Sequence, residues 1–145
     1  VVADIEFVRE PGVMELMRQV DHLIIGTALA EEITGRADPA AAVRALAEPS
    51  RACCVVTAGD RGCWYSEWGG EVRHFPAFPI EAVDTTGCGD VFHGAYAAWI
   101  AQGGEVPDAI RVASAAAALK AMHPGGRSGI PDRATVLRFL EEHSA

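Results

Sequence analysis

The sequence lacks the features that would place a chain in a membrane or on nucleic acid. Its 145 residues contain no apolar run long enough to span a bilayer, and the opening stretch VVADIEFVRE carries acidic residues where a secretory signal carries basic ones. The formal net charge of −8 provides no general basic field for phosphate backbones. We therefore expect a cytoplasmic protein without membrane or nucleic-acid partners, in which local features hold any anionic ligand.

The sequence also lacks a CxxC pair. Its four cysteines are Cys53, Cys54, Cys63 and Cys88, and the adjacent pair lies in an apolar run where neighbouring side chains would point to opposite faces of a strand. This spacing favours free, buried thiols in a reducing compartment over a metal site or a disulfide framework.

Apolar runs of strand length alternate with segments of helical spacing, and no repeat or linker interrupts them. The expected strands cover residues 1–7, 22–26, 51–59, 63–68 and 71–78, the last two as a hairpin or as short neighbours. The expected helices cover residues 12–20, 27–35, 38–48, 91–103, 107–122 and 131–143. This alternation predicts a layered α/β domain with a mostly parallel sheet, a class that binds ligands at the carboxyl ends of its strands.

The stretch VDTTGCGDVFHGAY, residues 83–96, combines two glycines with the start of a predicted helix. Gly87 and Gly89 allow unusual backbone conformations, and we expect them to leave the N–H groups of residues 86–90 uncovered. Bare amides at a helix start attract anions, helped by the helix dipole. In an acidic protein, such a turn is a candidate phosphate site.

Asp90 is the difficult residue in this turn, because a carboxylate beside an anion site repels the anion. It is either a simple helix cap or a group that must accept a proton at that place. The dipole favours its ionised form, which can orient a hydroxyl and take its proton during attack on a phosphoryl group. The spacing alone leaves both interpretations open.

Four stretches together resemble the PfkB family of carbohydrate kinases. DTTGCGDVFHGAY is similar to the family signature DTxGAGDxFxGxF, and TAGDRGCWY to its T-x-G-x-x-G strand and turn. ASAAAALKAMHPGG resembles the alanine-rich helix with its glycine loop, and IPDRATVLRFL resembles the closing helix. The resemblance covers essentially the whole chain and implies a ribokinase-like three-layer α/β/α fold.

The resemblance also implies roles for individual residues. Asp90 would be the catalytic base for a sugar hydroxyl, and Gly87, Cys88 and Gly89 would supply the anion hole. Asp84 and Thr86, with the glycine loop, match the region that binds a monovalent cation in many relatives, so K⁺ is expected beside ATP and Mg²⁺. The implied nucleotide-binding residues are Thr57, Gly59, Gly62, Ser114, His123, Gly125 and Gly126.

Two further side chains near this site have structural alternatives. His93 follows Asp90 by three residues on nearly the same helix face, and we favour packing over an acid–base pair. Arg127 lies in the glycine loop, where a solvated arginine is favoured over a phosphate ligand.

The chain departs from the family pattern in two motifs. Cys88 replaces the usual alanine of the anion hole, where the helix dipole favours a thiolate. Since no Cys–His–Asn arrangement can be read from the sequence, we favour a thiol without a nucleophilic role. The N-x-x-E motif that organises magnesium-bound phosphates falls on Gly26 and Leu29, neither of which binds a metal–water shell. This loss resembles ketohexokinase-like branches of the family more than ribokinase itself.

Length is the third departure. Relatives carry an N-terminal half with a β-sheet lid and a sugar-binding motif, so residues 1–145 resemble only the C-terminal, nucleotide-binding and catalytic-base part. Because the chain also begins with valine inside a strand pattern, we expect it to belong to a longer polypeptide. A sheet cut in this way would expose an edge and an apolar face, which favours a homodimer or an unseen remainder.

The sequence thus predicts an ATP-dependent kinase acting on a small sugar or a similar hydroxyl. Two alternatives stay open. One is a non-catalytic nucleotide-binding or regulatory module derived from such a kinase, and the other is a vitamin kinase of the same superfamily. The sugar, the phosphorylated hydroxyl and the oligomeric state are not determined by the sequence.

Overall fold

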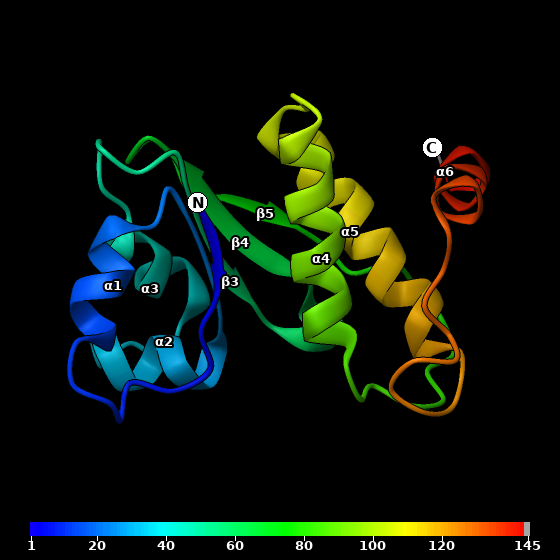
Figure 1. Cartoon of the computed structure of the whole chain (residues 1–145), viewed down its shortest axis with the longest axis horizontal. Coiled ribbons are helices and arrows are strands. Elements are labelled where there is room, and N and C mark those ends of the chain that lie inside the picture. Colours follow the sequence, from blue (N-terminus) through cyan, green and yellow to red (C-terminus); the bar gives the residue numbers. More distant parts are fainter. Residues whose placement is uncertain (144–145) are drawn as a thin grey trace. The chain divides into compact units, whose positions relative to one another are not determined.

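A computed structural model describes residues 1–143 of the chain (Figure 1). The chain divides into two compact units, Val1–Pro76 and the part from Ala77 onward, and each unit is described here by itself. The first unit contains a five-stranded sheet and three α-helices, and the second contains three further α-helices.

The sheet of the first unit has the strand order β1-β2-β3-β4-β5. The first three strands are parallel, and the last two continue the sheet in antiparallel pairing, β3 with β4 and β4 with β5. The predicted mostly parallel α/β sheet is confirmed, and so is the predicted hairpin. The strands are β1 Val2–Asp4, β2 His22–Gly26, β3 Cys53–Thr57, β4 Cys63–Glu67 and β5 Arg73–Phe75.

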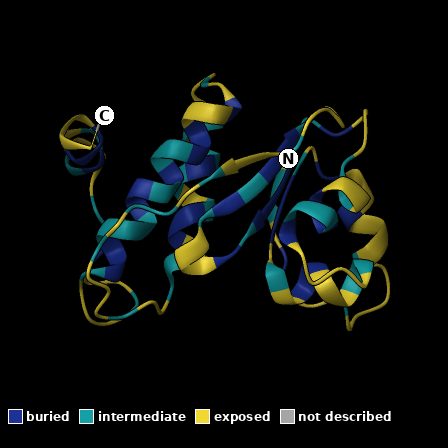
Figure 2. Cartoon of the chain, turned by 180° about the vertical axis from the view of Figure 1, so that it is seen from behind, coloured by how far each residue is buried: buried dark blue, intermediate teal, exposed yellow. Residues whose placement is uncertain are grey.

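Three helices and a short 3₁₀ turn connect these strands. Side chains of β2 and β3 alternate toward the helices, where Leu23, Ile25 and Val56 pack against Leu29 and Val43 in one apolar cluster. These residues are buried (Figure 2). The connecting elements are α1 Val13–Gln19, α2 Thr27–Thr34, α3 Pro39–Leu46 and the 3₁₀ turn Gly59–Arg61.

The residues predicted to end α2 and to begin α3 have these roles in the structure. Gly35 ends α2 in the left-handed conformation, at φ 66°. The Asp38 carboxylate accepts the N–H of Ala41 at 2.8 Å, with Pro39 in the first helical position. The first strand is shorter than predicted, because pairing with β2 stops at Asp4.

The second unit consists of α4 Cys88–Ala101, α5 Val106–Ala121 and α6 Arg133–Glu142. α5 buries small alanines such as Ala115 and Ala116, which let it pack closely against its neighbours. Val91 of α4 and Phe139 of α6 join the same apolar cluster. α4 begins at Cys88 rather than at the predicted residue 91, because the left-handed Gly87 starts the helix.

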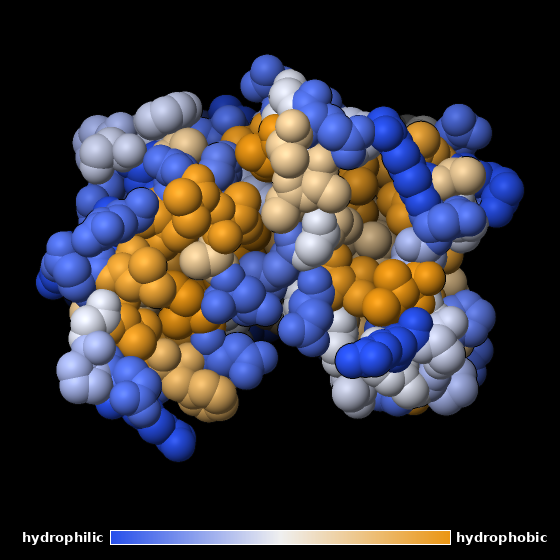
Figure 3. Space-filling model, in the orientation of Figure 1, coloured by the Kyte–Doolittle hydropathy of each residue, from blue (hydrophilic) through white to orange (hydrophobic). Residues whose placement is uncertain are grey.

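In residues 1–143, every helix falls short of the length and apolar composition that crossing a bilayer requires. Apolar side chains do reach the surface (Figure 3). The predicted homodimer stays a prediction. The large exposed apolar residues are Val1, Phe7, Met14, Leu16, Trp68, Val83 and Ile130.

Candidate active site

The start of α4 is built around Gly87. This residue is the N-cap and has φ 76°, a left-handed conformation that favours glycine. A Cβ atom at this position would lie 3.1 Å from the carbonyl oxygen of Gly126 and 3.6 Å from the Asp90 carboxylate. The turn before α4 therefore lies against the glycine loop after α5, with no room for a side chain between them.

Not all of the five amides predicted to be bare are free. The N–H of Thr86 donates to the Asp84 carboxylate at 2.8 Å, and the N–H of Cys88 donates to the carbonyl of Thr85 at 3.1 Å. The prediction is wrong for these two amides, because the turn before the helix uses them itself. In the described part of the chain, the amides of Gly87, Gly89 and Asp90 have no hydrogen-bond partner.

Asp84 connects the two loops of the site. Its carboxylate accepts the N–H of Thr86 and that of Gly125, each at 2.8 Å. Its own N–H donates to the carbonyl of Ala121 at 3.0 Å, and its carbonyl accepts the ammonium of Lys120 at 2.7 Å. The bonds to Thr86 and Gly125, with a smaller effect of the Lys120 charge, lower the pKa of Asp84 to about 2.

Lys120 is the residue of this site that the sequence analysis missed. It is the only lysine of the chain, lies in the last turn of α5 and is fully buried at 0% exposure. A signal was available, because a single lysine in an alanine-rich apolar stretch is unusual. A buried ammonium is costly unless it is paired, so Lys120 needs a role that offsets this cost.

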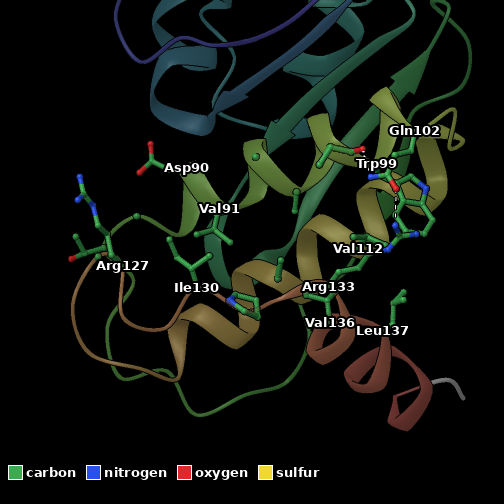
Figure 4. Close-up of a pocket in the computed structure, with 18 residues that line it drawn as sticks. Asp90, Val91, Trp99, Gln102, Val112, Arg127, Ile130, Arg133, Val136 and Leu137 are labelled. Carbon is green, nitrogen blue, oxygen red and sulfur yellow. Dashed lines mark hydrogen bonds between the residues drawn. The ribbon is translucent and has the colours of Figure 1, made fainter.

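A pocket of about 750 Å³ opens beside Asp90 and lies within the second unit. Figure 4 shows Asp90 and Arg127 on one side of it, and Trp99 with Arg133 on the other. The walls between them are mostly apolar and come from α4, α5, the glycine loop and α6. A ligand in this pocket would reach the Asp90 carboxylate at one end.

His93 was predicted to pack and Arg127 to be a solvated loop residue. Nδ1 of His93 donates to the carbonyl of Gly89 at 2.8 Å, a bond within the helix that suits a packing role. Arg127 is exposed, as predicted, and it also lines the pocket, so its guanidinium can reach an anion there.

All four cysteines are free thiols, as predicted. Cys53, Cys54 and Cys63 are buried, whereas Cys88 is only partly buried, so the predicted burial is wrong for this residue. Burial raises the pKa of Cys54 to about 12. Burial also raises the pKa of Cys88, while Lys120 lowers it and Asp84 raises it by smaller amounts, so the thiol form is favoured.

The remaining predicted nucleotide residues lie in two places. Thr57, Gly59 and Gly62 belong to the first unit, where they end β3 and form the predicted turn before β4. Ser114 and His123 belong to the second unit but do not line the pocket beside Asp90. Their nucleotide-binding roles stay predictions.

No group of three or more carboxylate, histidine or cysteine side chains gathers as a metal site within residues 1–143. Gly26 and Leu29 stand at the positions of the family's N-x-x-E motif. Gly26 ends β2, and Leu29 is buried in the apolar cluster of the first unit. The side chains of the family's N-x-x-E motif are therefore missing at these two positions.

Comparison with solved structures identifies the fold. The ribokinase of Thermotoga maritima is 32% identical, with a TM-score of 0.77 over 88% of this chain and 44% of that chain. The ribokinase of Arabidopsis thaliana, solved with ribose and ATP, is 28% identical, with a TM-score of 0.78 over 88% of this chain and 43% of that chain. The predicted ribokinase-like α/β fold is confirmed.

The family follows from the sequence. The profile of the pfkB family carbohydrate kinases matches residues 5–133. Ribokinase of Haemophilus influenzae is 33% identical over 132 residues, which are 88% of this chain and 43% of that protein. This chain belongs to the pfkB family of carbohydrate kinases, and it spans less than half the length of these relatives.

The Asp84 connection predicts a characteristic pH dependence. The folded-state pKa of about 2 lies below the ordinary value of 3.8, so the carboxylate stabilises the fold above pH 3.8. This contribution is lost as the pH falls from 3.8 to about 2. Asp84→Asn should therefore lower the melting temperature at neutral pH, and the difference from wild type should shrink through that window.

Thermal unfolding followed by circular dichroism from pH 7 to pH 2 measures this difference. Asp60→Asn is the matched control, because Asp60 is an exposed carboxylate in the 3₁₀ turn. A difference between Asp84→Asn and wild type that stays constant down to pH 2 would contradict the assignment.

Proposed function

We propose that the protein containing this chain transfers the γ-phosphoryl group of ATP to a hydroxyl of a small sugar. One observation carries the proposal. The left-handed Gly87 opens α4 with unpaired amides, and Asp90 in the same first turn places a carboxylate at the edge of an open pocket. Membership of the pfkB family supports the same reaction class.

The anion hole is proposed to consist of the N–H groups of Gly87, Gly89 and Asp90. These donors lie at the positive end of a 14-residue helix, where a transferring phosphoryl group gains both hydrogen bonds and a favourable dipole. The amide of Cys88 is excluded, since it donates to Thr85. Arg127 supplies an additional positive charge from the glycine loop.

Asp90 is proposed as the base. The sugar hydroxyl gives its proton to the Asp90 carboxylate while its oxygen bonds to the γ-phosphorus, and the bond from that phosphorus to the leaving ADP oxygen breaks. The proton leaves Asp90 when the phosphorylated sugar departs. Asp90 is exposed and lines the pocket, so its carboxylate is accessible to a hydroxyl.

ATP and a sugar are the proposed ligands. The Arabidopsis relative was solved with ribose and ATP, and we extend that pair of ligand classes to this protein. We propose that the glycine loop of the second unit contacts the nucleotide phosphates. The residues assigned to the nucleotide are Thr57, Gly59, Gly62, Ser114, His123, Gly125 and Gly126.

Magnesium stays a prediction. The described residues offer no cluster of metal ligands, and Gly26 and Leu29 stand where the family has its N-x-x-E motif. We therefore derive no step through this ion. The chemistry proposed here depends on hydrogen-bond donors and on Asp90.

A nucleotide-binding module without catalytic activity is the second candidate. Gly26 and Leu29 favour it, because a chain that cannot organise a metal-bound triphosphate can still bind a nucleotide. This candidate predicts ATP binding without phosphate transfer. The vitamin-kinase alternative, the homodimer and the cytoplasmic location also stay predictions.

Asp90→Asn tests the assignment of the base. In the full polypeptide we expect kcat for phosphate transfer to ribose, or to another accepted sugar, to fall by about 10²- to 10⁴-fold. ATP binding should be retained, since asparagine preserves the shape of the helix start. A coupled ADP-release assay measures kcat, and calorimetric titration measures the affinity for ATP. An Asp90→Asn protein with wild-type kcat would contradict the proposal.

Gly87→Ala tests the turn itself. The added Cβ must adopt the left-handed conformation and meet the Gly126 carbonyl at 3.1 Å, so we expect the amides to move and kcat to fall about 10²-fold. Gly103→Ala is the matched control, because Gly103 also has a left-handed φ of 81° but has no neighbour within 4 Å of an added Cβ. Equal losses of kcat in the two variants would show that backbone strain alone, rather than the position of the amides, is responsible.

A further inference from the structure

Lys120 places a positive charge beneath the anion-binding turn. Its side chain is fully buried, and its ammonium donates to the main-chain carbonyl of Asp84 at 2.7 Å, across 36 positions of sequence. It lies in the last turn of α5, where the helix dipole favours a cation. The lysine therefore sits where α5, the turn before α4 and the glycine loop meet.

The ammonium donates to Asp84, a residue whose other polar groups are also hydrogen-bonded. Asp84 is bonded at its N–H to Ala121 and at its carboxylate to Thr86 and Gly125. The Lys120 charge acts on two titratable groups, the carboxylate of Asp84 and the thiol of Cys88. The positive charge of Lys120 is thus hydrogen-bonded to the same turn that carries the unpaired amides.

A K⁺ ion does not suit this arrangement. The resemblance implies a monovalent-cation region at Asp84 and Thr86 with the glycine loop, but both carboxylate oxygens of Asp84 already accept backbone N–H groups. A second monovalent cation there would also lie near a buried ammonium. Two like charges at such short range repel each other.

An ammonium group and K⁺ carry the same single charge, are of similar size and both bind carbonyl oxygens. The ammonium has one property that the ion lacks, since it is covalently attached and cannot dissociate. It therefore stays bonded to the Asp84 carbonyl oxygen at every ionic composition.

We propose that the Lys120 ammonium takes the structural place of a monovalent cation, so that the candidate active site needs no K⁺. Lys120 is then a positioning residue. Its ammonium fixes the position of the Asp84 carbonyl. Asp84 in turn fixes the turn whose amides are proposed to bind the phosphoryl group.

The experiment compares wild type, Lys120→Ala and Lys120→Met of the full polypeptide in KCl and in choline chloride at equal ionic strength. Melting temperature and K⁺ binding by calorimetry are the primary measurements. Wild type should show no K⁺-specific shift and no K⁺ binding. Lys120→Ala should melt about 5 °C or more lower in choline chloride, recover part of that loss in KCl or ammonium chloride, and bind K⁺.

The Lys120→Met variant separates the effect of losing the charge from the effect of losing side-chain volume. Methionine fills most of the volume and has no charge, so its melting temperature should fall and K⁺ should not restore it. Arg138→Ala is the control for loss of an exposed positive charge and should respond to neither salt. K⁺ binding or K⁺-specific stabilisation in wild type would overturn the proposal, even if both lysine variants fail to fold.

Phosphate transfer provides a secondary readout that rests on the proposed function. Wild-type kcat should be equal in the two salts, whereas kcat of Lys120→Ala should rise in KCl. A protein that transfers no phosphate would contradict the proposed function alone, because melting temperature and ion binding are measured without turnover. Wild-type activity that requires K⁺ would overturn the inference about Lys120 and leave the proposed reaction in place.

Discussion

The candidate site depends on one residue, Asp84, which is bonded at every polar group. Its carboxylate joins the turn before α4 to the glycine loop, its N–H is bonded to the end of α5, and its carbonyl accepts the buried ammonium of Lys120. These bonds fix the backbone that leads into Gly87. The left-handed Gly87 can then start α4 with free amides, and Asp90 follows in the first turn.

Much of this could be predicted from local sequence. The cap at Asp38 and the stop at Gly35 are short-range signals that act within one helical turn, so they appear in the structure as expected. Alternation of strands and helices indicated the α/β class, and the motif around Gly87 and Asp90 indicated a helix start with unpaired amides. The comparisons confirm the family and the ribokinase-like fold.

Other features depend on contacts that no local pattern contains. The amides of Thr86 and Cys88 are occupied by their own turn, which glycine spacing does not reveal. The pKa of Cys88 is raised by burial, which depends on the packing around the start of α4. The role of Lys120 depends on a hydrogen bond to Asp84 across 36 positions, and only the folded chain brings the two together.

The most direct test of the central claim is a crystal structure of the full polypeptide with ADP, aluminium fluoride and an accepted sugar. Aluminium fluoride imitates the phosphoryl group during transfer. The account predicts that its fluorides lie about 3 Å from the amides of Gly89 and Asp90, with the Asp90 carboxylate within hydrogen-bond reach of the sugar hydroxyl. An analogue bound away from the start of α4, or a sugar that does not contact Asp90, would contradict it.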